Sequence, residues 1–274
     1  MTCDVCSANA NRWLEDPGWR GKIGFISPPH MSIDATEFLR IAPPGFRVCQ
    51  TMTYVPGFQL NAGDLVKAAE QLEGCSMALR QAGVDLIAQC GTPFSFAQGG
   101  FIFGKEVQTK IEKATGLPMV MMGFSIINAL KKMGYRSVAV ACTYYSDDIA
   151  QMYTRFFEDS GIKVAGMENW VSQGIFTSQD EVSRAMSPVH TRITMGLVYK
   201  SAKTVAQHHP EADCIIISGG GVSTMDVLQA LEEDMRKPVI SSLAALFWEI
   251  LHRQGVFAPI RGRGSLLATL EKGL

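Results

Sequence analysis

The sequence has almost no net charge and no long apolar segment. It contains 25 lysines and arginines against 26 aspartates and glutamates, which gives a formal net charge of −1 at pH 7. A nucleic-acid partner would require a basic stripe to neutralise phosphates, and no run of basic residues occurs. A membrane span requires about 20 consecutive apolar residues, and the longest candidates, such as Asp213–Ser218, have only the length of a strand. We therefore expect neither a nucleic acid nor a membrane as a partner.

Targeting and disulfide patterns are also missing. Residues 1–19 lack the basic start and apolar stretch of a signal peptide, so we expect a cytoplasmic protein. Seven cysteines make an odd number without the spacings of a disulfide framework, and in a cytoplasmic chain most of them should be reduced. Cys3 and Cys6 form a CxxC pair with no second pair nearby. The sequence thus predicts no metal site, although it leaves open whether the thiols of Cys3 and Cys6 bind a metal ion.

The pattern of apolar residues predicts an α/β fold. A chain of 274 residues with 47% hydrophobic and 19% charged residues can bury a large core. Short apolar runs alternate with amphipathic stretches, which is typical of a parallel sheet covered by helices. The expected strands are residues 22–26, 46–53, 84–90, 119–122, 137–142, 163–168, 214–218 and 239–241. The expected helices are residues 63–81, 105–114, 126–133, 147–159, 190–207, 224–235 and 244–253.

An internal repeat indicates two similar halves. Residues 84–92 (VDLIAQCGT) can be laid over residues 212–220 (ADCIIISGG), and in both an Asp-led apolar strand breaks into a glycine loop. In both halves a Pro-led strand and a further helix follow. Such halves commonly face each other across a cleft that the loops at the carboxyl ends of the strands enclose. The expected division is a first half of residues 20–134 plus 256–274, a second half of residues 135–255, and an N-terminal extension of residues 1–19.

Both glycine loops have the chemistry of an anion site. Gly91–Ser95 and Ser218–Thr224 each follow an expected strand and offer backbone N–H groups. Glycine lets a ligand approach the backbone closely, and N–H groups at a loop or helix start can hold an anion. Neither loop is a dinucleotide fingerprint or a P-loop, because GxGxxG and GK[ST] are both absent. A tight turn without a ligand is the alternative for each loop taken alone.

Two further segments lie at expected strand ends. Tyr144 and Tyr145 follow the strand that ends at Cys142, and one phenol could enter the cleft, although a core or surface tyrosine fits equally well. Pro28 and Pro29 follow the first strand and form a rigid rim. The next residue, His30, is the best placed titratable group among the five histidines.

Five motifs in the same order resemble the superfamily of arylmalonate decarboxylases, maleate isomerases and aspartate/glutamate racemases. They are Gly24–Pro29, Gly91–Phe96, Ala114–Pro118, Ser218–Asp226 and Pro238–Ser242, the last followed by Phe247 and Trp248. The similarity spans about residues 22–270 and is greatest to the arylmalonate decarboxylases. It implies an α/β fold of two Rossmann-like halves, with parallel four-stranded sheets related by pseudo-two-fold symmetry.

The resemblance also implies carbanion chemistry beside a carboxylate. Racemases and maleate isomerases carry one cysteine on each loop, and arylmalonate decarboxylases keep only the second. Gly91 and Gly219 occupy these two positions, so this sequence lacks both thiols. Two-base racemisation requires an acid or base on each face of the substrate. We therefore do not expect a racemase or an isomerase that adds a cysteine to its substrate.

The sequence lacks the two thiols but retains the residues that, by resemblance, hold the substrate anion. By resemblance, Thr92, the backbone of Gly220 and Gly221, and Tyr145 stabilise the oxyanion, with Tyr144 as an alternative because the spacing there is off by one. Pro93 replaces a hydroxyl donor, so one hydrogen bond is lost. The residues expected to bind substrate are Pro28, Pro29, His30, Gly91, Pro93, Phe94, Gly219 and Gly221.

The sequence leaves open which group donates the proton in place of the missing thiols. Cys90 lies one position before the expected place, and a shift of one residue on a strand normally turns a side chain to the other face. A buried structural cysteine is therefore the alternative for Cys90. Cys142, Tyr144, His30 and water complete the set of candidates.

The expected function is that of a cofactor- and metal-independent lyase. It would decarboxylate a small, aryl- or alkyl-substituted carboxylate through an enediolate held in an oxyanion hole. One alternative is an isomerase or hydrolase of a related carboxylate or cyclic amide with a different acid or base. Another is a small-anion binder without catalytic activity. The sequence leaves the substrate and the oligomeric state open.

Overall fold

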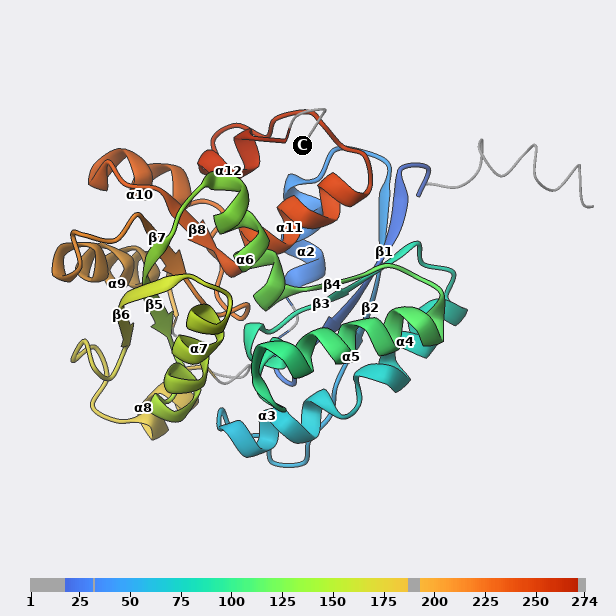
Figure 1. Ribbon diagram of the computed structural model, residues 1–274, viewed down its shortest axis with the longest axis horizontal. Helices are drawn as coiled ribbons and strands as arrows, with labels where there is room; N and C mark the ends of the chain where they lie inside the picture. The colour runs from blue at the N-terminus through green and yellow to red at the C-terminus, as the bar shows by residue number, and fades with distance from the viewer. Residues whose placement is uncertain (1–17, 32, 187–192, 271–274) are drawn as a thin grey trace, which may run out of the picture.

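The computed structural model describes residues 18–31, 33–186 and 193–270 (Figure 1). Cys3, Cys6 and the first residues of the helix expected at 190–207 lie outside these described residues. The described chain forms two parallel four-stranded sheets covered by helices, which confirms the predicted fold class. None of its helices has both the length and the apolar character needed to span a bilayer.

The two sheets have the same strand order. The first contains β1 (Gly21–Ser27), β2 (Phe46–Met52), β3 (Leu86–Gln89) and β4 (Met119–Met121) in the order β2-β1-β3-β4. The second contains β5 (Ser137–Thr143), β6 (Lys163–Asn169), β7 (Cys214–Ile217) and β8 (Val239–Ser241) in the order β6-β5-β7-β8. Both central strands β3 and β7 are buried throughout, as expected for strands covered on both faces.

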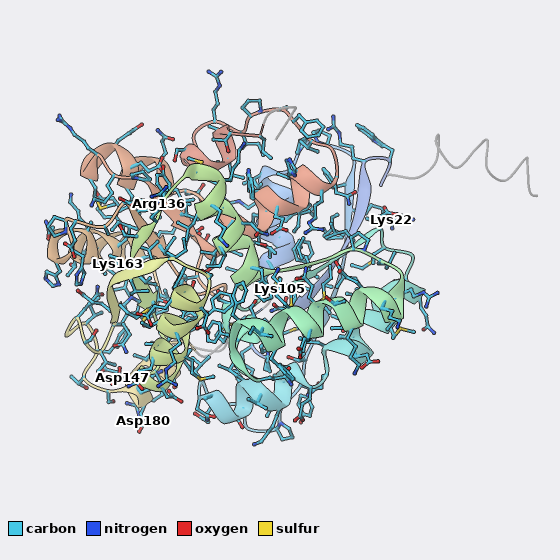
Figure 2. All side chains as sticks on the ribbon, in the orientation of Figure 1. Lys22, Lys105, Arg136, Asp147, Lys163 and Asp180 are labelled. Carbon is cyan, nitrogen blue, oxygen red and sulfur yellow. The ribbon has the colours of Figure 1, made fainter. Side chains whose placement is uncertain are left out.

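The Asp that leads each repeated strand has the same role in both halves. The Asp85 carboxylate accepts the Lys22 backbone N–H at 2.8 Å, and the Asp213 carboxylate accepts the N–H groups of Arg136 and Ser137 at 2.9 Å each. Figure 2 labels Lys22 and Arg136, at the starts of β1 and β5. Each aspartate thus ties the start of a central strand to its neighbour, which explains why the repeat begins with Asp.

The helices surround and join the two sheets. The first half has α2 (Asp34–Ile41), α3 (Ala62–Ala69), α4 (Leu72–Gln81), the 3₁₀ turn η1 (Thr92–Ser95), α5 (Gly100–Thr115) and α6 (Met122–Met133). The rest of the described chain has α7 (Asp147–Asp159), α8 (Gln179–Ala185), α9 (Met195–His208), α10 (Leu228–Met235), α11 (Ser242–Arg253) and α12 (Ser265–Ala268).

The helices differ from the sequence-based expectation in several places. The single helix expected at 63–81 is two helices, α3 and α4, with a break at Glu70 and Gln71. The short helices α2, α8 and α12 were not expected. With eight, seven and four residues respectively, they are too short to show a clear helical period.

The helices α6 and α11 form the seam between the halves. They follow β4 and β8 directly and pack side by side near the centre of the molecule (Figure 1). All residues from Ser242 to Leu251 on α11 are buried. Within this seam the Asn128 amide donates to both oxygens of the Glu249 carboxylate at 3.2 Å. The seam fixes how the carboxyl ends of the two sheets face each other.

The segment after α11 contacts α10. The Ser265 backbone N–H and hydroxyl both donate to the Glu232 carboxylate at 2.7 Å, and the Arg263 guanidinium pairs with Asp226. These contacts lie with elements of the second half. The expected division, in which residues 256–274 complete the first half, stays a prediction.

Candidate active site

The two glycine loops meet at the seam between the halves. Thr92 follows β3, and its hydroxyl lies 3.1 Å from the hydroxyl of Ser242, the first residue of α11. Gly220 follows β7, and a Cβ added to it would lie 3.2 Å from the methyl group of Met122, the first residue of α6. Each loop thus contacts the first residue of the helix that belongs to the other half. The repeat brings both loops to one place.

The first loop is fixed in a conformation that requires glycine. Gly91 has a φ of +88°, in the left-handed region that side chains disfavour. The buried Gln89 amide donates to the carbonyls of Cys90 and Gly91, so these carbonyls are turned toward the core. A Cβ on Gly91 would lie 3.1 Å from the Pro28 ring. The expected first thiol position therefore has a strained backbone and little room.

The second loop excludes a side chain more strongly. Gly219 has a φ of +124°, and a Cβ there would lie 2.6 Å from the Thr143 hydroxyl and 2.7 Å from the Tyr144 ring. Thr143 cannot easily withdraw, because its hydroxyl donates to the Ser218 carbonyl at 2.6 Å. Its own φ is +51°, an unusual conformation for a residue with a branched side chain. The space that a thiol would need at Gly219 is filled.

Hydroxyl groups converge beside the loops. The Ser242 hydroxyl lies between that of Thr92, at 3.1 Å, and that of Ser218, at 3.3 Å. The fully buried Tyr145 hydroxyl has no hydrogen-bond partner among the described residues. Burial raises the pKa of Tyr145, while the nearby hydroxyls of Thr92 and Ser218 lower it, so this phenol stays protonated and can donate. A neutral donor without a partner therefore points into the space beside Thr92.

Tyr144 and Tyr145 differ in what their hydroxyls contact. The Gly221 N–H donates to the Tyr144 hydroxyl at 3.1 Å, and that hydroxyl donates to the Met31 sulfur at 3.3 Å. Two of the expected anion donors, Gly221 and Tyr144, are therefore engaged with each other. The Gly220 N–H, in contrast, donates to no other described residue. The geometry favours Tyr145 and Gly220 over Tyr144 and Gly221 as free donors.

Both cysteines proposed as proton donors are buried and neutral. Burial raises the pKa of the thiols of Cys90 and Cys142 well above the usual value, so neither is a thiolate at neutral pH. Cys90 faces Asp34, whose carboxylate raises the pKa of the thiol further.

Asp34 is the residue of this region that the sequence did not indicate. It is the first residue of α2, and its side chain is buried between the two loops, where burial raises the pKa of the carboxyl to about 7. Asp34 could not be predicted from the sequence because α2 was not expected, and an aspartate that follows a proline-rich turn is typically exposed.

A narrow apolar chamber, with a cavity volume of about 20 Å³, lies beside the first loop. It brings together five of the residues expected at the site: Pro28, Gly91, Pro93, Tyr144 and Tyr145. Its remaining walls are apolar side chains from both halves: Met31, Phe58, Leu60, Leu65 and Ile149. The chamber suits an apolar substituent next to the neutral donors.

Other expected residues lie outside the chamber. Phe94 is buried in the core, and Pro29 is buried but does not line the chamber. His30 is exposed, with a φ of +67°, and its ring packs edge-on against Phe58 at 5.8 Å between centroids.

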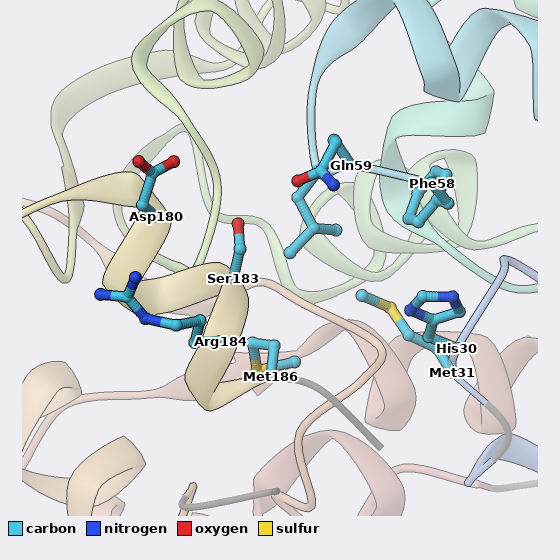
Figure 3. A pocket seen from close by; sticks show the side chains of 9 residues that line it. His30, Met31, Phe58, Gln59, Asp180, Ser183, Arg184 and Met186 are labelled. Carbon is cyan, nitrogen blue, oxygen red and sulfur yellow. The ribbon is translucent and has the colours of Figure 1, made fainter. Parts of the chain in front are cut away.

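A second, wider pocket adjoins the chamber and shares Met31, Phe58 and Leu60 with it. Figure 3 shows His30, Met31 and Phe58 on one side of this pocket and α8 on the other. The Arg184 guanidinium on α8 points away from Met31. His30 thus lies at the outer pocket and not among the donors.

No group of three or more potential ligands is placed to hold a metal ion in the part of the chain that the structure describes. The convergent groups are instead neutral hydroxyls, a backbone N–H and one buried carboxyl. Such a set can hold a carboxylate by hydrogen bonds and stabilise negative charge that develops on it.

The family follows from comparison with known proteins. The model of the family described as arylmalonate decarboxylase matches residues 60–267, well over half of the chain. The chain belongs to this family. Arylmalonate decarboxylase from Bordetella bronchiseptica is 29% identical over 189 residues, which cover 69% of this chain and 73% of that protein.

Solved structures share the fold of this arylmalonate decarboxylase family member. A liganded variant of arylmalonate decarboxylase, with one glycine changed to cysteine and one cysteine to serine, has a TM-score of 0.77 and 23% identity over 90% of this chain and 98% of that chain. Maleate isomerase from Pseudomonas putida S16 with maleate has a TM-score of 0.77 and 17% identity over 91% of this chain and 98% of that chain. The family model and the curated relative both describe a decarboxylase, so the chain belongs to a family of enzymes.

Proposed function

We propose that the chain is a cofactor-independent decarboxylase of small malonates that carry an apolar substituent. The observation that carries this proposal is the buried, unpartnered hydroxyl of Tyr145 beside Thr92 and the free N–H of Gly220. A buried polar group without a partner is costly and needs an explanation, and a role toward a bound ligand is one. A carboxylate is the ligand that accepts from several neutral donors at once.

The reaction needs a site that stabilises an enediolate. One carboxylate of the malonate accepts from Tyr145, Thr92 and Gly220. The bond between the α-carbon and the second carboxyl breaks, CO₂ leaves, and the electron pair moves onto the retained carboxylate as an enediolate. The fixed donors stabilise this added charge without reorganisation, and the low-polarity surroundings strengthen each interaction. A proton then reaches the α-carbon and completes the monocarboxylate product.

The apolar walls support the choice of substrate. Pro28, Phe58 and Leu65 face the chamber and offer no counter-charge to a second carboxylate. A charged carboxylate placed there loses its solvation and is destabilised, whereas the neutral CO₂ molecule is not. These apolar walls therefore favour loss of the carboxylate as CO₂. An aryl or branched alkyl substituent would match the apolar character of the same surface and would require the chamber to widen when it binds.

The isomerase alternative has less support. Gly91 and Gly219 stand where the resemblance places the two thiols, and the neighbours of both glycines leave little space for a side chain. Covalent addition of a cysteine to a double bond therefore lacks its nucleophile at both positions.

A panel of substrates tests the proposal. We expect the purified chain to release CO₂ from 2-aryl- or 2-alkylmalonates, to leave maleate unchanged, and to keep its activity in a metal chelator. Production of fumarate from maleate would establish the isomerase instead. Thermal stabilisation by malonates without CO₂ release would establish an anion binder, because a ligand that binds only the native state raises apparent stability without turnover.

A further inference from the structure

Asp34 is a buried acid with one free oxygen. Its side chain is 1% exposed, and one carboxyl oxygen accepts the Ser27 hydroxyl at 2.8 Å. The other oxygen, Oδ1, is buried and has no hydrogen-bond partner among the described residues. The Ser27 hydroxyl is in turn fixed by the Gln50 amide, which donates to it at 2.9 Å. The carboxyl is therefore held on one side and open on the other.

The surroundings of Asp34 keep its proton in place up to neutral pH. Burial raises the pKa of Asp34 to about 7, and hydrogen bonds from Ser27, Cys90 and its own backbone N–H lower it. None of these three groups carries a positive charge. The titratable groups that interact with Asp34 are Cys90 and Tyr144, and the pKa of each is raised, so both stay neutral over the same range.

The free oxygen faces the second glycine loop. A Cβ added to Gly220 would lie 3.6 Å from Asp34 Oδ1 and 3.2 Å from the Met122 methyl group. A ligand atom at this position would contact both the loop and the free oxygen of the acid, and the flexible end of the Met122 side chain would have to shift to admit it. Gly220 follows Gly219, the position at which the family thiol is absent.

We propose that Asp34 is the catalytic acid that protonates the α-carbon in place of the missing thiol. This inference rests on the proposed decarboxylation. Cys90, which lowers the pKa of the same carboxyl, acts as a positioning residue.

The proton balance of this step is simple. After CO₂ leaves, the O–H bond of the Asp34 carboxylic acid breaks and a C–H bond forms at the α-carbon, with the enediolate pair supplying the electrons. Asp34 is left as a carboxylate and takes a proton from water before the next turnover. Each turnover therefore consumes one proton and releases one CO₂.

The first test replaces the acid and measures kcat with a malonate that the wild type decarboxylates. We expect Asp34→Asn to lower kcat by about 10² or more, the usual contribution of a general acid. In D₂O the wild type should add deuterium to one face of the α-carbon only. Any product of Asp34→Asn should be racemic at this carbon. Asp147→Asn is the matched control, since Asp147 is the first residue of α7 in the other half and is exposed.

The second test shifts the pKa of Asp34 without removing its carboxyl group. The wild-type kcat should fall as the pH rises through about 7, because the carboxylic acid is the active form. Ser27→Ala and Cys90→Ala each remove a hydrogen bond that lowers the pKa of Asp34, so each should shift this fall to higher pH. A merely structural role of Asp34 would not move the profile.

A third readout needs no turnover. A folded-state pKa above the unfolded value adds stability at acid pH, and this contribution is lost as the pH rises from about 4 to 7. Asp34→Asn should therefore have a higher Tm than the wild type at pH 8 and lose this advantage at pH 4. The same ordering at both pH values would contradict the buried acid.

Two outcomes overturn the proposal in distinguishable ways. If the wild type releases CO₂ and Asp34→Asn keeps its rate, its pH profile and its stereochemistry, Asp34 is not the acid and the decarboxylase assignment stands. If the wild type releases no CO₂ from any malonate, the proposed function fails and this inference fails with it.

Discussion

Replacing Tyr145 with phenylalanine is expected to lower kcat for malonate decarboxylation by about 10²–10³, the usual effect of removing one oxyanion donor. The phenol is buried and protonated, with the Thr92 and Ser218 hydroxyls near it and none of the described residues within hydrogen-bond distance, so it can donate to the substrate. The loss should appear in kcat more than in KM, because the charge on the retained carboxylate increases in the transition state. Steady-state kinetics with CO₂ detection measure it.

Tyr153 supplies the matched control for this substitution. Its hydroxyl is also buried, and Ser218 lowers its pKa as it does that of Tyr145, but its ring stacks on Phe96 at 5.2 Å, and it does not line the chamber. Tyr153→Phe should therefore keep wild-type kcat. Equal losses in both variants, or full activity of Tyr145→Phe, would remove Tyr145 from the oxyanion hole.

Placing a side chain at Gly219 is expected to destabilise the fold strongly. Gly219→Ala should lower the free energy of unfolding by about 3 kcal/mol, the sum of an unfavourable positive φ and overpacking in a tight site. The overpacking arises because the new Cβ would lie 2.6 Å from the Thr143 hydroxyl. Gly219→Cys should behave alike and yield no racemase, since its thiol has no room. Denaturant unfolding and a racemisation assay check both.

Gly134→Ala separates backbone strain from steric conflict. Gly134 has a φ of +76° at the end of α6, but no atom lies within 4 Å of an added Cβ. This control should cost only about 1 kcal/mol, the penalty of the left-handed conformation. If Gly219→Ala were no more destabilising than Gly134→Ala, the loop would have room for a thiol, and the loss of the family cysteine would lack a steric explanation.

Much of the fold could be predicted because its features are local in sequence. The strand positions follow from apolar runs, and the two halves follow from the repeated Asp-led strands, whose carboxylates make equivalent backbone contacts in both. The helix break at Glu70 and Gln71 could not be predicted, because no glycine or proline marks it. α2 and α8 were missed because a helix of two turns has little period to detect.

The candidate site was only partly accessible from sequence. The glycine loops and Thr92 stand out because glycine and hydroxyl residues follow apolar strands. The contact of Thr92 with Ser242 joins residues 150 positions apart, and it depends on the packing of α6 against α11. Sequence spacing could not separate Tyr145 from Tyr144, since only the contact of Tyr144 with Gly221 and Met31 distinguishes them.

The most direct test of the central claim is a crystal structure with a bound monocarboxylate product, such as an arylacetate. The account predicts one carboxylate oxygen within hydrogen-bond distance of the Tyr145 hydroxyl and the Gly220 N–H, with the other near Thr92. The aryl group should lie against Pro28 and Phe58, with its α-carbon toward Asp34. A carboxylate bound to Arg184 in the outer pocket, with Tyr145 still unpartnered, would contradict the account.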